Sequence, residues 1–144
     1  MDSDPSLAET MVVHAQDAVA HAQSSFQTVL DYSPDSMQLV EEILGKLHLQ
    51  MPRKLFGRLF KKGPPKEAVW AISNAYGGYL GEVVRRTAGG EWQYDTELLP
   101  GTKTICLVLA KGRAFPPAKV FKRLNNGAEE NVWTYFQTLT RDLK

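Results

Sequence analysis

Apolar side chains recur every three or four positions through the first part of the chain, and this spacing places them on one face of an α-helix. The pattern predicts a long amphipathic helix over residues 7–30. Ser33 and Pro34 then provide a capping residue and a first-turn proline, so a second helix is expected to begin there and to carry its own apolar stripe through Leu47. We expect these two helices to pack as a hairpin.

A third helical pattern covers residues 67–86, although three glycines interrupt it. Each glycine costs about 1 kcal/mol relative to alanine inside a helix, so their presence needs a structural reason. Small residues recur at helical spacing and predict a groove that a neighbouring backbone can approach closely; they are Ala71, Ala75, Gly78 and Gly81. We expect this segment to be the central buried helix.

The pattern changes after Gly89-Gly90, where residues 91–94 alternate in the manner of a β-strand. A β-branched and aliphatic run over residues 104–110 predicts a second strand. Because Pro100-Gly101 is a turn signal between the two runs, antiparallel pairing is expected.

Two further helices are predicted near the C-terminus, a short one that starts at Phe115-Pro116-Pro117 and a last one over residues 129–143. Helices that flank a short run of adjacent strands are typical of the α+β class. The predicted fold is therefore α+β, with four to five helices packed on a small antiparallel sheet in a single domain over residues 1–144.

The composition of the chain is that of a globular protein, with 43% hydrophobic and 23% charged residues in a length of 144. One cysteine excludes an intramolecular disulfide, and the acidic residues after Met1 differ from the basic start of a secretory signal. The longest apolar run, residues 105–110, is far shorter than the roughly 20 residues that span a bilayer. We therefore expect a cytoplasmic protein without a transmembrane segment.

The formal net charge of +1 conceals a strong asymmetry along the chain. Residues 1–50 contain eight acidic residues and one basic residue, whereas residues 51–66 contain six basic residues and no acidic one. A protein that binds nucleic acid through a broad surface carries its positive charge more widely. Binding to nucleic acid is therefore not expected of the chain as a whole, and any electrostatic contact should be local.

Three motifs resemble those of a family of small bacterial domains of unknown function. They are Leu30-Asp31-Tyr32-Ser33-Pro34, Gly77-Gly78-Tyr79-Leu80-Gly81-Glu82-Val83 and Gly89-Gly90-Glu91-Trp92. The pattern joins a DYS-type helix start to a YLGE helix and a following tryptophan strand, and the resemblance covers roughly residues 28–139. It implies small stand-alone proteins, some of them encoded near toxin and immunity genes, and hence a binding role.

The first candidate binding site combines aromatic residues with a carboxylate and consists of Tyr76, Tyr79, Glu82 and Trp92. Tyr79 and Glu82 lie three positions apart on one helical face, and the tryptophan strand follows closely. A carboxylate among aromatic rings can act as an acid or base with a raised pKa, or can bind a cation. The alternative is that Glu82 orients structure beside core aromatic side chains.

The second candidate is a basic surface formed by Arg53, Lys54, Arg58, Lys61 and Lys62. The bases from Lys54 onward lie at helical spacing, opposite apolar residues such as Leu55 and Phe56. A basic amphipathic element of this kind can lie on an anionic membrane or dock on an acidic partner. Alternatively, the apolar residues fill the core while the basic residues stay in water. Residues 52–66 are therefore predicted to be a basic insertion or a loop.

Histidine and cysteine predict neither a metal site nor a cofactor. His14 and His21 are about 10 Å apart along a helix, which is too far to share a metal ion, and a surface contact between Asp17 and His21 is expected instead. Cys106 lies within an apolar strand and is predicted to be a buried hydrophobic side chain.

These observations predict a non-catalytic protein-binding module, of the immunity type that masks a toxin or an enzyme. Its partner would be a protein, and the acidic N-terminal helices could face a basic partner. The alternatives are a ligand-binding domain or enzyme with a pocket around Tyr79, Glu82 and Trp92, and a peripheral contact with membrane or nucleic acid through residues 53–66.

Overall fold

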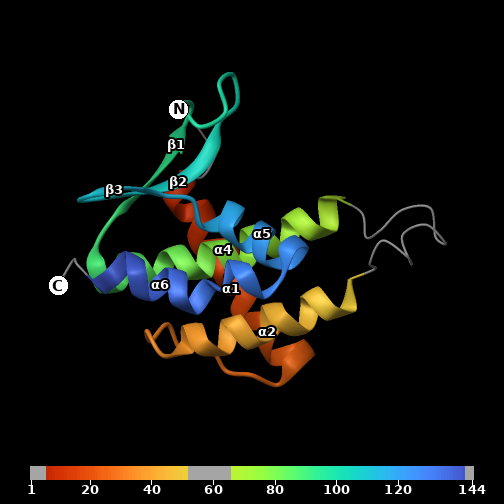
Figure 1. Ribbon diagram of the computed structural model, residues 1–144. Helices are drawn as coiled ribbons and strands as arrows, with labels where there is room; N and C mark the ends of the chain where they lie inside the picture. The colour runs from red at the N-terminus through yellow and green to blue at the C-terminus, as the bar shows by residue number, and fades with distance from the viewer. Residues whose placement is uncertain (1–5, 52–65, 142–144) are drawn as a thin grey trace.

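The computed structural model describes residues 6–51 and 66–141, in which five α-helices and a three-stranded antiparallel sheet form the α+β fold that the sequence predicts (Figure 1). The helices are α1 (Leu7–Phe26), α2 (Ser36–Gln50), α4 (Lys66–Ala88), α5 (Pro116–Asn126) and α6 (Val132–Arg141), with a 3-10 turn at Ala128–Glu130. The strands are β1 (Glu91–Asp95), β2 (Thr104–Leu109) and β3 (Gly112–Ala114). The predicted basic surface at residues 53–62 lies outside the described residues.

Helix α1 begins at a capping box, in which the Ser6 side chain accepts from the backbone of Glu9 and the Glu9 side chain accepts from the backbone of Ser6. The helix ends at Phe26, earlier than its apolar stripe predicts. Gln27 adopts the left-handed conformation with φ of 50°, which closes the helix. Leu30, the last residue of that stripe, lies in the non-helical segment that follows α1, and its side chain is buried there.

The predicted hairpin of the first two helices is wrong. Helix α1 lies along α4, whereas α2 packs against α5 and α6. Glu41 of α2 explains this arrangement, because its carboxylate accepts from Arg123 of α5 at 2.9 Å and from the backbone N–H of Val132 at 3.0 Å. Val132 is the first residue of α6, so the same carboxylate also compensates the positive end of that helix.

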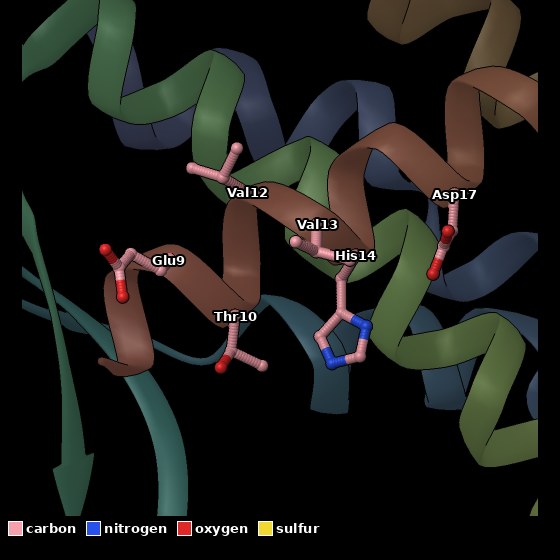
Figure 2. A pocket seen from close by; sticks show the side chains of 6 residues that line it. All are labelled: Glu9, Thr10, Val12, Val13, His14 and Asp17. Carbon is pink, nitrogen blue, oxygen red and sulfur yellow. The ribbon is translucent and has the colours of Figure 1, made fainter. Parts of the chain in front are cut away.

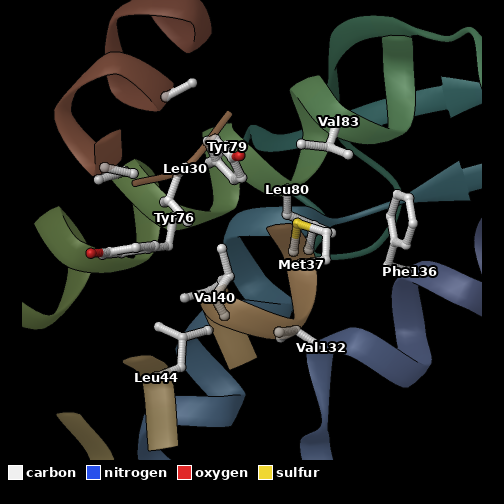
Figure 3. Packing of buried hydrophobic residues seen from close by; sticks show 14 of the residues in the cluster. Leu30, Met37, Val40, Leu44, Tyr76, Tyr79, Leu80, Val83, Val132 and Phe136 are labelled. Atoms are coloured by element: carbon white, nitrogen blue, oxygen red, sulfur yellow. The ribbon is translucent and has the colours of Figure 1, made fainter. Parts of the chain in front are cut away.

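Helix α4 is the central element of the core, as the sequence predicts. Residues 75–84 of α4 are all buried, and helices α1, α5 and α6 pack around it. Figure 3 shows Leu80 and Val83 of α4 directed toward apolar residues of α2 and α6, among them Met37 and Phe136. Burial of these side chains provides the main stabilisation of the fold.

The three glycines of α4 allow close approach to three different neighbours. A Cβ atom at Gly78 would lie 3.0 Å from the Met11 carbonyl oxygen of α1, and one at Gly77 would lie 2.4 Å from the Cα of Pro117 in α5. A Cβ atom at Gly81 would lie 2.1 Å from the Trp92 ring. The predicted small-residue groove is therefore confirmed at Gly78 but not at Ala71, which is exposed.

The sheet has the order β1-β2-β3, and the β1–β2 pair is the predicted antiparallel hairpin. Trp92 lies opposite Leu107 and Tyr94 opposite Ile105. The short strand β3 is not predicted by the sequence, because three residues give too little alternation to detect. Figure 1 shows that the closed end of the β1–β2 hairpin projects beyond the helices. Among the described helices, none is both long and apolar enough to cross a membrane.

Candidate functional site

Glu82 and Trp92, two members of the first predicted site, are in direct contact. The Trp92 indole N–H donates to Glu82 Oε2 at 2.8 Å, and Arg85 donates to both carboxylate oxygens at 2.9 and 3.0 Å. Only 1% of Glu82 is exposed. Both oxygens of this buried carboxylate are therefore already engaged by protein donors.

The environment of Glu82 favours its ionised form. Burial alone would raise its pKa, but the hydrogen bonds from Arg85 and Trp92 and the charges of Arg85 and Arg86 outweigh burial and hold the pKa below its ordinary value. A general acid at neutral pH requires the opposite shift. The geometry consequently favours a structural role for Glu82, as an ionised carboxylate that accepts hydrogen bonds, over a role in proton transfer.

Tyr79 makes its contacts with the segment between α1 and α2 rather than with Glu82. Its hydroxyl oxygen accepts from the backbone N–H of Tyr32 at 2.7 Å and lies 2.7 Å from Ser36 Oγ. Tyr32 has a φ of 65°, which is uncommon for a residue other than glycine, and the Arg86 guanidinium lies 3.8 Å from the centre of its ring. Tyr79 and Arg86 together hold this segment on α4.

Tyr76 contacts His21 of α1, for which the sequence predicts a different partner, Asp17. Its hydroxyl lies 2.7 Å from Nδ1 of His21, and the two rings meet edge to face. Partial burial lowers the pKa of His21. The expected contact between Asp17 and His21 is thus replaced, at His21 Nδ1, by a contact between α1 and α4 that no spacing along the chain could reveal.

The four residues therefore divide into three separate contacts, each of which fastens a different segment to α4. The residues that carry the resemblance described above, Tyr32, Tyr79, Glu82 and Trp92, all take part in these contacts. None of them lines the pocket on α1, the pocket between α2 and the start of α4, or the pocket beside Trp133 and Phe136 of α6. Their use as a ligand-binding site remains a prediction.

The projecting hairpin has a tip that is ordered by a buried carboxylate. Asp95, at the end of β1, accepts from the backbone N–H groups of Glu97 and Leu98 at 3.1 and 2.8 Å and pairs with Arg113 of β3. These backbone hydrogen bonds, together with the Arg113 guanidinium, hold the pKa of Asp95 below its ordinary value. The carboxylate therefore fixes the first half of the loop.

The second half of the tip is a tight turn. The Thr102 N–H donates to the Leu99 carbonyl at 2.9 Å, with Pro100 and Gly101 at the two central positions. Gly101 has a φ of 85°, which suits glycine after proline in a turn of this kind. The hairpin tip, residues 94–103, is thus restrained at both of its halves.

The hairpin tip exposes a group of apolar side chains. The exposed fractions are 51% for Tyr94, 53% for Leu98 and 55% for Leu99. Single exposed apolar residues are ordinary, but three of them on one restrained projection indicate an interaction surface. The one signal of this surface in the sequence is the pair Leu98-Leu99 next to Pro100-Gly101, which by itself predicts only a turn.

A second surface lies on α1, where a pocket of about 590 Å³ is lined by Glu9, Thr10, Val12, Val13, His14 and Asp17 (Figure 2). We call it the α1 pocket. Val12 and Val13 lie near its middle, and the carboxylates of Glu9 and Asp17 flank them. The described part of α1 contains no basic residue other than histidine, so this surface is acidic.

Catalytic groups are not brought together in the described residues. No cluster of three or more metal-ligating side chains occurs among them. Cys106 is buried in β2, as predicted, and burial raises the pKa of its thiol. His48 contacts the carbonyl oxygen of Leu124 at 2.6 Å through Nδ1, which ties α2 to α5.

Comparison of the chain with protein-family models, with curated proteins and with solved structures finds no match.

Proposed function

We propose that the chain is a non-catalytic protein-binding module of the immunity type, which masks a toxin or an enzyme. The observation that carries this proposal is the restrained hairpin tip with its exposed Tyr94, Leu98 and Leu99. A preordered apolar projection loses little conformational freedom on binding, which favours affinity. Its convex shape suits a concave apolar site on a folded protein, such as the cleft of an enzyme.

Two further features support a protein partner. The acidic surface of α1 can attract a basic partner and raise the rate of association. The resemblance to small bacterial domains encoded near toxin and immunity genes points to the same class of function. The single cysteine favours a reducing, cytoplasmic location.

The test is an affinity pull-down from host lysate with three forms of the full chain. They are the natural sequence, a Leu98→Ser/Leu99→Ser variant and a Val29→Ser control, in which a side chain that is 69% exposed lies between α1 and α2. We expect the natural chain and the control to retain one protein at stoichiometric level and the tip variant to lose it.

Circular dichroism and thermal unfolding establish that all three forms are folded. The two leucine side chains are largely in water, so their replacement should change stability by no more than about 0.5 kcal/mol. If the natural chain retains no protein at low salt, the binding-module proposal fails. If the tip variant retains the same protein equally well, the hairpin tip is not the interface.

A further inference from the structure

Helix α1 is joined to the rest of the fold by one side-chain hydrogen bond. Among the described residues, the contact between His21 Nδ1 and the Tyr76 hydroxyl oxygen, at 2.7 Å, is the only hydrogen bond between α1 and another helix or strand. The other contacts of α1 are mainly apolar and lie along α4. We infer that this hydrogen bond is a pH-sensitive switch, in which protonation of His21 releases α1 from α4. The switch belongs to the fold itself and needs no partner.

The direction of this hydrogen bond depends on the charge of His21. Only 1% of Tyr76 is exposed, and its hydroxyl group has no second hydrogen-bond partner in the described part of the chain. When His21 is neutral, Nδ1 can accept the hydroxyl proton of Tyr76, which satisfies both groups. When His21 is protonated, its Nδ1–H can only donate, so the Tyr76 O–H loses its acceptor within the interface. A buried donor without an acceptor destabilises the packing of α1 on α4.

The groups that surround His21 do not compensate for its protonation. On α4, the titratable group that faces it is Tyr76 itself, and burial raises the pKa of that tyrosine, so it stays neutral. On α2, the Lys46 ammonium lies 5.8 Å from the centre of the Phe26 ring, which meets the imidazole edge to face, so this side supplies a positive charge. Asp17, one turn earlier on α1, forms no ion pair with His21 within the described residues.

The pH range of the switch follows from the burial of His21. Burial lowers its pKa below the ordinary 6.5, and no described charge on α1, α2, α4 or β1 contributes to this shift. The stabilisation by neutral His21 is therefore fully present above pH 6.5 and is lost as the pH falls through the lowered pKa. The other histidines have no such contact, because the Leu124 carbonyl can accept from His48 in either charge state and His14 is exposed.

Helix α1 is suited to local release because it buries little apolar area. Its fully buried side chains are one methionine and three alanines, whereas α2 buries four larger apolar side chains. Alanine contributes little hydrophobic stabilisation, since the gain scales with the apolar area removed from water. The loss of one polar contact is thus a large share of what holds α1, and we expect α1 to open before the rest of the fold. Opening uncovers the apolar stripe formed by Met11, Ala15, Ala18 and Ala22.

Hydrogen exchange of the purified full chain at about pH 7.5 and about pH 5.0 tests the inference, with each rate divided by the intrinsic rate at that pH. We expect the protection factors of the Ala18 and Ala22 amides to fall at least about threefold at the lower pH. At both pH values they should lie at least about tenfold below those of Val83 and Val84 in α4. Unchanged protection of α1, or equal protection of α1 and α4, overturns the inference.

Two matched substitutions identify the titrating group. His21→Asn places an amide oxygen near the position of Nδ1, so the side chain can still accept from Tyr76 but does not titrate. The protection factors of α1 in this variant should agree within about 1.5-fold at the two pH values. His14→Asn makes the same change at an exposed histidine of α1 and should keep the threefold fall of the natural chain. A fall in His21→Asn as large as in the natural chain overturns the inference.

An NMR titration of the natural chain provides a second test that does not depend on a variant that folds. We expect the imidazole signals of His21 to titrate with a midpoint below 6.5, as burial requires. A midpoint at or above 6.5 overturns the inference, because protonation of His21 would then cost nothing in the folded state.

Discussion

Glu82 is a carboxylate that accepts hydrogen bonds from Trp92 and Arg85 at a site where only 1% of the residue is exposed. Through these bonds it joins β1 to the centre of α4. A buried ionised group is stable only while its hydrogen bonds persist, so replacement of either partner should be costly.

The Glu82→Gln substitution tests this role. An amide carries no charge and replaces one carboxylate oxygen with an NH2 group, so at least one N–H group of Arg85 faces another donor in place of an acceptor. We expect the free energy of unfolding in urea to fall by about 2–3 kcal/mol, whereas a Glu91→Gln control at an exposed position should change it little. An unchanged stability would show that the network contributes nothing to folding.

The same variant should differ from the natural chain in acid. Because the pKa of Glu82 is lowered in the folded state, its stabilisation is present above the ordinary value of 4.5 and is lost as the pH falls through the lowered pKa. The natural chain should therefore lose stability more steeply below pH 4.5 than Glu82→Gln does. Parallel pH profiles of the two proteins would contradict this assignment.

At the residue scale, the sequence predicts which side chains are buried better than it predicts their partners. The burial of Cys106 and the grouping of Glu82 with Trp92 follow from apolar patterns and from proximity along the chain. The partner of Tyr76 is His21, 55 positions earlier. Contacts of this separation depend on how helices pack, which periodicity does not encode.

At the scale of the elements, the β1–β2 hairpin depends on one side chain, Asp95, for the local structure of its tip. Asp95 uses its carboxylate both to accept from the loop backbone and to pair with Arg113. The turn contacts restrain the loop tip, and the ion pair fastens it to β3. The two roles can be separated, because asparagine keeps an oxygen acceptor but has no charge.

Hydrogen exchange measures this difference. In Asp95→Ala we expect the amides of Glu97 and Leu98 to exchange at least about tenfold faster, because the acceptor is lost. In Asp95→Asn, exchange should stay within about threefold of that in the natural chain. Equal exchange in the natural chain and in Asp95→Ala would show that the tip is not ordered by this carboxylate.

The helices and strands themselves were largely predictable from sequence. Helix α4 and strands β1 and β2 were placed to within a few residues, because their periods and the flanking glycines are clear. The packing of α1 on α4 does not follow from the same patterns, since the partly buried Glu41 carboxylate that holds α2 against α5 and α6 gives no periodic signal.

At the scale of the whole molecule, the acidic helices α1 and α2 should act on association kinetics. The described helices α1 and α2 and the segment between them contain six acidic residues and one basic residue, and Glu41 is the acidic residue that pairs with Arg123. Long-range attraction of a basic partner by such a surface weakens as salt shortens the Debye length to about 8 Å at 0.15 M ionic strength.

Stopped-flow measurements with the protein captured in the pull-down test this prediction. We expect the association rate constant to fall at least about tenfold between 20 mM and 500 mM salt, with the dissociation rate changing much less. An Asp17→Asn/Glu42→Gln variant, which alters two exposed carboxylates, should show a shallower salt dependence. A rate constant independent of salt would remove the electrostatic role of α1 and α2.

Burial of Cys106 has a practical consequence for all of these experiments. The chain has one thiol, which lies inside the sheet with a raised pKa and should react slowly with maleimides while the protein is folded. A cysteine introduced at an exposed position such as Thr102 would then be the reactive site for a fluorophore or a spin label. Distances and mobilities at the tip can thus be followed without removing the native cysteine.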